Sequence, residues 1–151
     1  MVLKTIAIVI VIVVVVFMVY IRLAPSDPAR WNVIVATTDP VTPGPCLDKV
    51  VIVPQGARVT CVLTGSPQEV LSKLDATAMA YPRTTRLAGA RADGLITWIS
   101  RSRLMGYPDY ITAQATQTSL GTRLDILSRQ RFGSSDAGVN AARLKNWLAS
   151  F

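Results

Sequence analysis

The pattern of apolar and polar positions divides the chain into a strongly apolar N-terminal segment and a longer part in which apolar and polar residues alternate with each other. Residues 5–21 hold no charged side chain, with Lys4 before them and Arg22 after them. About 20 consecutive apolar residues in a helix span the hydrocarbon core of a bilayer. A strand of this length would be far longer than strands usually are. The pattern therefore predicts a transmembrane helix over residues 1–22.

A cleaved signal peptide is the alternative for this segment, because a positive start and an apolar run are common to both. The run is long for a signal peptide, and Leu23-Ala24-Pro25 is a poor cleavage site. We therefore expect a retained, single-pass anchor. The positive charges on its two sides are nearly balanced, so they do not decide its orientation.

Residues 23–46 are rich in proline and predict a juxtamembrane linker followed by an irregular loop. We expect Pro25 and Pro28 to keep the linker extended and to end the anchor helix. Trp31 is close enough to the anchor to lie among lipid headgroups, and it would fit equally well in the core of the domain. Residues 47–151 are expected to form one globular domain of ordinary size.

Within residues 47–151, β-branched runs at 49–53 and 57–63 predict a hairpin. Residues 66–69, Ser-Pro-Gln-Glu, predict a capping box that opens a helix ending before Pro82. A second helix is expected from about Ser135 to Phe151. Further strands are predicted at residues 84–87, 95–103, 110–118 and 122–131. The fold class is therefore α+β: a transmembrane helix, then an antiparallel sheet with two packing helices.

The charge balance is basic, with 16 Lys and Arg against 9 Asp and Glu, no His, and a net charge of +7. Nucleic acid is an obvious partner for a basic chain. The anchor and the lack of an aromatic–basic RNA motif argue against it. A positive face near anionic headgroups or an acidic partner subunit fits better, and a merely solvated basic surface is the alternative.

The only two cysteines are Cys46 and Cys61. In an oxidising compartment a disulfide between them would contribute about 3 kcal/mol for a loop of about 15 residues. Two unpaired buried thiols are the alternative. Cysteine usage favours a periplasmic domain. Without histidine or a CxxC motif, zinc is not expected, and we predict no cofactor.

Motifs for catalysis are missing from the sequence. It has no histidine for acid–base relays, no nucleophile elbow, and no glycine pattern for phosphates or dinucleotides. The aspartates are scattered, so the sequence does not indicate a carboxylate pair. We expect that the protein is not an enzyme, and a hydrolase that uses two converging carboxylates is the weakest hypothesis.

Two Arg-x-Arg pairs end predicted strands, Arg101 with Arg103 and Arg129 with Arg131. Residues two apart in a strand share a face, so the four guanidinium groups gather if both strands belong to one sheet. Such a cluster binds phosphate or carboxylate groups bidentately. The structural alternative is internal pairing with aspartates, namely Asp109, Asp125 and Asp136.

Four segments form a recognisable pattern: residues 23–31, 81–84, 101–109 and 131–143. They resemble an uncharacterised bacterial family, domain of unknown function 1499, and the most specific part is GxSDxGVNxxR at residues 133–143. Family members often have histidine after the linker tryptophan, where this chain has Asn32. The resemblance implies a small, often membrane-anchored domain without an established reaction. It also implies a shared polar set, namely Arg83, Arg101, Arg103, Arg131, Asp136, Asn140 and Arg143.

The leading hypothesis is a non-catalytic accessory subunit of a larger bacterial inner-membrane complex of a respiratory or other energy-transducing kind. Its partners would be integral membrane subunits packed against residues 5–21. The second hypothesis is a standalone periplasmic domain that binds an anionic lipid or a phosphorylated ligand through arginines. The candidate site residues are Arg83, Arg101, Arg103, Arg129, Arg131, Asp136, Asn140 and Arg143.

Overall fold

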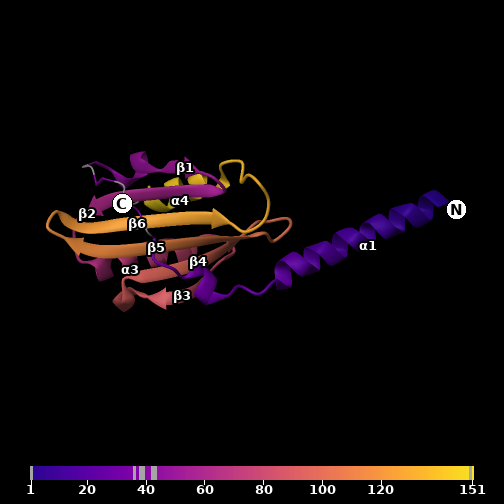
Figure 1. Cartoon of the computed structure of the whole chain (residues 1–151), viewed down its shortest axis with the longest axis horizontal. Coiled ribbons are helices and arrows are strands. Elements are labelled where there is room, and N and C mark those ends of the chain that lie inside the picture. The colour runs from indigo at the N-terminus through magenta and orange to yellow at the C-terminus, as the bar shows by residue number, and fades with distance from the viewer. Residues whose placement is uncertain (1, 36, 38–39, 42–43, 150) are drawn as a thin grey trace.

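A long N-terminal helix projects from one end of an α+β domain (Figure 1). The computed structural model describes residues 2–35, 37, 40–41, 44–149 and 151. The helix, α1 (Val2–Leu23), is long and apolar enough to cross a membrane. Its side chains up to Tyr20 are mostly exposed, whereas Ile21 is fully buried. The last turn of α1 is therefore where the helix meets the domain.

The domain is built on one six-stranded sheet, in which every neighbouring pair of strands is antiparallel. In spatial order the strands are β1 (Val51–Val53), β2 (Gly56–Leu63), β6 (Gly121–Gln130), β5 (Pro108–Thr118), β4 (Leu95–Arg101) and β3 (Thr84–Ala90). The other elements in the described part of the chain are α2 (Pro28–Trp31), α3 (Pro67–Ala80), α4 (Val139–Leu148) and the 3-10 turns η1 (Cys46–Lys49) and η2 (Arg91–Asp93). The predicted α+β class with an antiparallel sheet is confirmed.

Helix α3 begins where the capping box predicts. The Ser66 hydroxyl accepts a hydrogen bond from the Glu69 backbone N–H at 3.3 Å, and a Glu69 carboxylate oxygen accepts one from the Ser66 N–H at 2.7 Å. The Ser66 backbone N–H, with its hydroxyl, holds the pKa of Glu69 below its ordinary value. This local exchange satisfies two donors that the first turn of a helix leaves free.

The main core lies between one face of the sheet and the two helices α3 and α4. Trp98 of β4 and Trp147 of α4 are fully buried and meet edge to face, with ring centroids 5.6 Å apart. Leu71 and Leu74 of α3 pack in the same cluster. Aromatic pairs in this geometry stabilise a fold beyond the contribution of the apolar area that they bury. The two tryptophans therefore join α4 to strand β4.

Helix α4 begins at Val139, later than the predicted start near Ser135. The preceding residues Ala137 and Gly138 have φ of +49° and +81°, which no continuing α-helix allows. Val139, the first residue of the helix, is 52% exposed. The prediction assumed that the capping residue directly precedes the helix. Asp136 instead lies in a loop three residues before Val139, and its side chain accepts a hydrogen bond from the Asn140 N–H in the first turn.

The prolines of the linker after α1 predicted an extended chain, but part of the linker is helical. Pro28 occupies the first position of the short helix α2, and the Asp27 carboxylate accepts a hydrogen bond from the Ala29 N–H at 2.9 Å. Proline suits the first turn of a helix because the N–H that it lacks has no partner there. Residues 46–49 likewise form a 3-10 turn, so the first strand of the predicted hairpin is shorter than expected.

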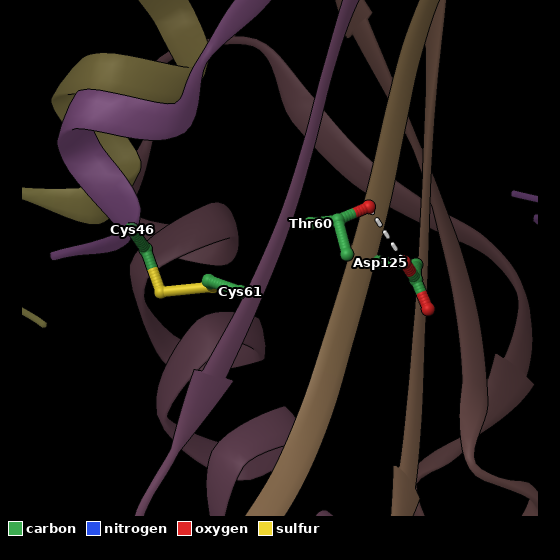
Figure 2. The surroundings of a disulfide bond; sticks show 4 residues. All are labelled: Cys46, Thr60, Cys61 and Asp125. Carbon is green, nitrogen blue, oxygen red and sulfur yellow. Dashed lines mark hydrogen bonds between the residues drawn. A yellow bond between two sulfur atoms is a disulfide. The ribbon is translucent and has the colours of Figure 1, made fainter. Parts of the chain in front are cut away.

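The structure joins Cys46 and Cys61 by a disulfide, which ties η1 to β2 (Figure 2). Figure 2 shows the neighbours Cys61 and Thr60 on opposite sides of β2, as the pleat of a strand requires. Cys61 enters the main core, while the Thr60 hydroxyl donates to Asp125 on the other face at 2.7 Å. The bond therefore fastens η1 to the helix side of the sheet. The predicted irregular loop before η1 lies partly outside the described residues.

Removing this bond is expected to lower the free energy of unfolding by about 3 kcal/mol, because the unfolded chain regains the freedom of the closed loop. The variant is Cys46→Ala with Cys61→Ala, which keeps both buried positions apolar. Urea unfolding of the full chain in detergent micelles measures the change. Equal stability of this variant and the native chain would contradict the prediction, and reductant should affect the native chain alone.

Candidate functional site

The second face of the sheet, opposite α3 and α4, is covered by the chain that follows α1. We call residues 25–35 the covering segment. Trp31 lies flat on Tyr110 of β5, with ring centroids 3.8 Å apart and planes 5° from parallel. Trp31 is only 8% exposed. Of its two predicted positions, the one inside the domain is therefore correct, in a second small core with Ile99.

Side chains of three strands, β4, β5 and β6, form hydrogen bonds to the covering segment. The Trp31 carbonyl accepts hydrogen bonds from the Arg129 guanidinium at 2.9 Å and the Thr112 hydroxyl at 3.1 Å. The Thr97 hydroxyl donates to the Asn32 side chain at 2.9 Å, and Gln114 accepts from the Val35 N–H. These polar side chains occupy the sheet face that helices leave open, so the segment is held in one register across it.

The last turn of α1 contacts two loops at the end of the sheet where β4 and β6 finish. We call this the α1 end, and Figure 1 shows its loops beside the helix. The Arg22 guanidinium donates to the Leu104 carbonyl at 3.1 Å. The Tyr20 and Phe132 rings meet edge to face, with centroids 6.4 Å apart. Together with the covering segment, these contacts fix the direction of α1 relative to the sheet.

Arg129, near the end of β6, and Arg131, just beyond it, bind the covering segment. Arg131 donates to the Pro25 carbonyl at 2.7 Å and to the Tyr110 hydroxyl at 3.2 Å. Arg129 lies 5.3 Å from the centre of the Trp31 ring, within cation–π range. Burial lowers the pKa of Arg129 from its ordinary value. Both guanidinium groups therefore bind the protein's own chain.

The arginines near β4 lie apart from those of β6, because β5 separates the two strands. Arg83 donates to the Arg101 carbonyl at 3.1 Å, and Arg101 donates to the Gly106 carbonyl at 3.0 Å. Arg103 lies beyond β4, is exposed, and has no partner among the described residues. The two Arg-x-Arg pairs share a sheet but do not form one cluster. Nor do they pair with the predicted aspartates.

The remaining predicted residues meet beneath the start of α4. Arg143 is 5% exposed and forms an ion pair with Asp109 at 2.8 Å. It also donates to the Asn140 side-chain oxygen at 2.6 Å, and that oxygen accepts from the Ser128 hydroxyl. Buried charges persist in proteins when they are paired and hydrogen-bonded. We call Asp109, Ser128, Asn140 and Arg143 the buried polar network.

Ser128 was missed by sequence reasoning, although the sequence carries a signal for it. Leu124 and Ile126 alternate into the main core, so the next residue of that phase, at position 128, points the same way. A serine at a buried position needs a hydrogen-bond partner. Asp109 was noted only as a pairing alternative. Its partner Arg143 is 34 residues away, and no local pattern connects them.

A cavity of about 590 Å³ opens at the α1 end, between α1 and the loops of the domain. Phe17 of α1, Tyr107 and Phe132 contribute its aromatic lining, and Asp109 and Asp136 contribute carboxyl groups. Burial raises the pKa of Asp109, and the nearby Asp136 adds to this. Among the described residues no three His, Cys, Asp or Glu side chains gather in a group able to hold a metal ion.

Asp136 holds the loop before α4 in place. Its two carboxylate oxygens accept hydrogen bonds from the Gly138 N–H at 3.0 Å and the Asn140 N–H at 2.9 Å. Burial alone favours the neutral acid, but these backbone donors outweigh it and lower the pKa of Asp136. A lowered pKa in the folded state stabilises the fold above the ordinary value of 3.8, and this contribution disappears as the pH falls through the folded value.

Asp136→Asn is therefore expected to cost about 1 kcal/mol of unfolding free energy at neutral pH, because asparagine keeps only one of the two oxygens that accept these backbone hydrogen bonds. The variant should also lose part of the acid sensitivity of the native chain below pH 3.8. Urea unfolding at a series of pH values measures both effects. Asp93→Asn is the control, because Asp93 is exposed and away from this loop. A parallel pH dependence in Asp136→Asn and the native chain would be inconsistent with this role.

Comparison with known proteins adds a family to this description. No curated protein matches the chain. A family model described as protein of unknown function (DUF1499) matches residues 35–151. The match covers the sheet, both packing helices and the buried polar network, and it begins at the end of the covering segment. The chain therefore belongs to the DUF1499 family of proteins of unknown function.

Proposed function

We propose that this chain is a non-catalytic accessory subunit of a larger protein complex, anchored by α1 in the bacterial inner membrane. The observation that carries the proposal is the fixed join between α1 and the domain. Arg22 binds the Leu104 carbonyl, and the covering segment is hydrogen-bonded across the sheet. A tether alone needs only a flexible linker. A fixed orientation suits a domain that must meet neighbouring subunits at a set height above the membrane.

The contacts of α1 also support its retention. Ile21 is fully buried, and Tyr20 meets Phe132 of the domain. A leader that is removed after export has no need of contacts with the mature fold. The 22 residues of α1 extend about 33 Å at the helical rise, close to the thickness of a bilayer core. The rest of its apolar surface is free to face lipid or the helices of other subunits.

The disulfide supports a periplasmic position for the domain. Disulfides persist in oxidising compartments such as the periplasm and are rare in the cytosol. Cys46 and Cys61 are joined and buried in the main core. With the domain in the periplasm, the N-terminus lies in the cytoplasm. Lys4 is then on the side where positive residues gather.

A non-catalytic role is supported by the hydrogen bonds and ion pairs that the aspartate carboxyl groups form within the fold. Asp75 accepts from Trp98 at 2.9 Å and pairs with Arg86, and Asp125 pairs with Arg123 at 2.7 Å. Asp109 and Asp136 line one cavity, as a hydrolase would require. However, Asp109 is bound to Arg143, and both oxygens of Asp136 accept backbone N–H bonds. These bonds give both carboxyl groups a structural role, which supports a non-catalytic protein.

The test is purification of the full chain through a C-terminal tag after gentle solubilisation. We expect other membrane proteins to be recovered in fixed stoichiometry, and their identities test whether the complex is energy-transducing. Ile8→Trp enlarges an exposed position of α1 and should weaken this recovery. Leu120→Trp, at the turn between β5 and β6, should not. A monodisperse monomer, measured by light scattering after size-exclusion chromatography, would overturn the proposal.

The alternative of an arginine cluster that holds a free anionic ligand has less support. Arg129 and Arg131 already bind carbonyl groups of the covering segment, and Arg101 binds the Gly106 carbonyl. A ligand would have to replace these bonds. The exposed Arg103 remains available.

A further inference from the structure

The loop between β4 and β5, residues 102–107, lies level with the last turn of α1. Arg22 donates to the Leu104 carbonyl at 3.1 Å. The Arg22 side chain also lies against Gly106, where an added Cβ would come within 2.9 Å of the Arg22 Cγ. The loop is therefore packed under the first charged residue after the apolar run of α1.

The loops at the α1 end also extend along α1 beyond this level. Phe17 lines the cavity together with Tyr107, Phe132 and Val139. Phe17 precedes Arg22 by five residues, or about 7.5 Å along the helix axis. It belongs to the uncharged run that must be in or near the hydrocarbon core if α1 spans the membrane. Loops that flank α1 at the level of Phe17 must therefore lie in the headgroup region.

The exposed side chains of this end suit a membrane interface. Leu104 is 77% exposed at the tip of the loop, and Leu23 at the end of α1 is 75% exposed. Arg103, next to Leu104, is exposed and has no partner among the described residues. Apolar side chains beside a basic one are typical of segments that lie in the headgroup region, where arginine meets lipid phosphates.

We propose that this loop is a second membrane contact: Leu104 enters the headgroup region beside α1, and Arg103 binds the phosphate of an anionic phospholipid. This rests on the proposed membrane-spanning role of α1, though not on the proposed complex. The domain then sits on the bilayer at two places. Its sheet end is held at the lipid surface, and the opposite turn at Leu120 points away from it.

The experiment measures the depth of single labels in the full chain. The native cysteines are joined in a disulfide, so the only free thiol is the one introduced in Ile12→Cys, Leu104→Cys or Leu120→Cys. Each variant carries an environment-sensitive fluorophore and is reconstituted into vesicles of phosphatidylcholine and phosphatidylglycerol. Spin-labelled lipids quench labels near the headgroups or deeper in the bilayer. Leu120 is the matched control for Leu104, because it is a similarly exposed loop leucine, at 75%.

We expect the label at position 104 to be quenched by headgroup spin labels several-fold more than the label at position 120. The label at position 12 should be quenched by spin labels on the acyl chains. If position 12 is quenched and position 104 matches position 120, the loop contact is wrong while the anchor stands. If position 12 is not quenched, the anchor and the loop contact both fail. Recovery of the chain as a monomer would overturn the accessory-subunit proposal without affecting these results.

A separate comparison tests whether Arg103 binds an anionic lipid. Arg103→Glu should weaken the quenching at position 104 in vesicles that contain phosphatidylglycerol, and have little effect in vesicles of phosphatidylcholine alone. An equal effect in both vesicles, or none in either, would overturn the assignment of Arg103 to an anionic headgroup.

Discussion

Replacing Arg143 with methionine is expected to destabilise the domain by about 3–5 kcal/mol, the usual cost of removing one partner of a buried ion pair. Methionine fills most of the space of the arginine side chain, so the loss of stability comes mainly from the buried polar groups that Arg143 no longer pairs. The Asp109 carboxylate would lose its ion-pair partner, and the Asn140 oxygen would lose a donor at 2.6 Å. Urea unfolding of the full chain in detergent micelles measures the change.

The pH dependence of this deficit separates charge from packing. Burial already raises the pKa of Asp109, and Arg143 opposes the rise, so the variant should raise it further. A carboxyl group with a raised folded pKa favours folding below its ordinary value of 3.8, and that contribution is lost as the pH rises. The deficit of Arg143→Met should therefore be largest at neutral pH and shrink on acidification. A deficit that does not change with pH would point to packing alone.

Lys145→Met is the matched control, because Lys145 lies on the same helix and is exposed. It should change the unfolding free energy by no more than about 0.5 kcal/mol. A comparable loss in both variants would show that α4 tolerates neither change, and would count against a special role for the buried polar network.

Trp31→Ala is expected to cost about 3 kcal/mol, the lower end of the range for removing a buried aromatic side chain. The indole stacks on Tyr110 and lies beneath the Arg129 guanidinium, so both contacts vanish together. Val33→Ala, in the same segment and 39% exposed, should cost far less. Urea unfolding of the two variants in parallel gives the difference.

The same substitution should loosen the join between α1 and the sheet. Spin labels at Leu3 and Leu120, both exposed, report the distance between the helix and the far turn. We expect one narrow distance distribution in the native chain and a clearly broader one in Trp31→Ala. If Trp31→Ala unfolds at lower urea but keeps the narrow distribution, the stack stabilises the sheet without orienting α1.

The elements of this fold were predictable where local chemistry determines them. The capping box at Ser66 and Glu69 placed the start of α3, and the predicted strand at residues 122–131 corresponds to β6. The start of α4 was misplaced because Asp136 binds backbone groups from a loop whose backbone conformation a sequence pattern does not reveal.

The candidate site was less predictable, because its contacts join distant parts of the chain. The Arg-x-Arg pairs were recognised as strand ends, but the strand order that separates them depends on how β5 inserts between β4 and β6. Nothing near Arg131 indicates that its partner is the Pro25 carbonyl, 106 residues earlier. Residue types and faces follow from periodicity, whereas partners across the sheet follow only from its topology.

The covering segment has a practical consequence for shortened versions of this protein. The family match begins at residue 35, and a soluble version cut there would lose the layer that shields Tyr110 and Ile99. Freshly bared aromatic and aliphatic surface on a flat sheet invites self-association. A version starting at Pro25 keeps the covering segment and removes the apolar helix α1. It should remain soluble at concentrations where the shorter version precipitates.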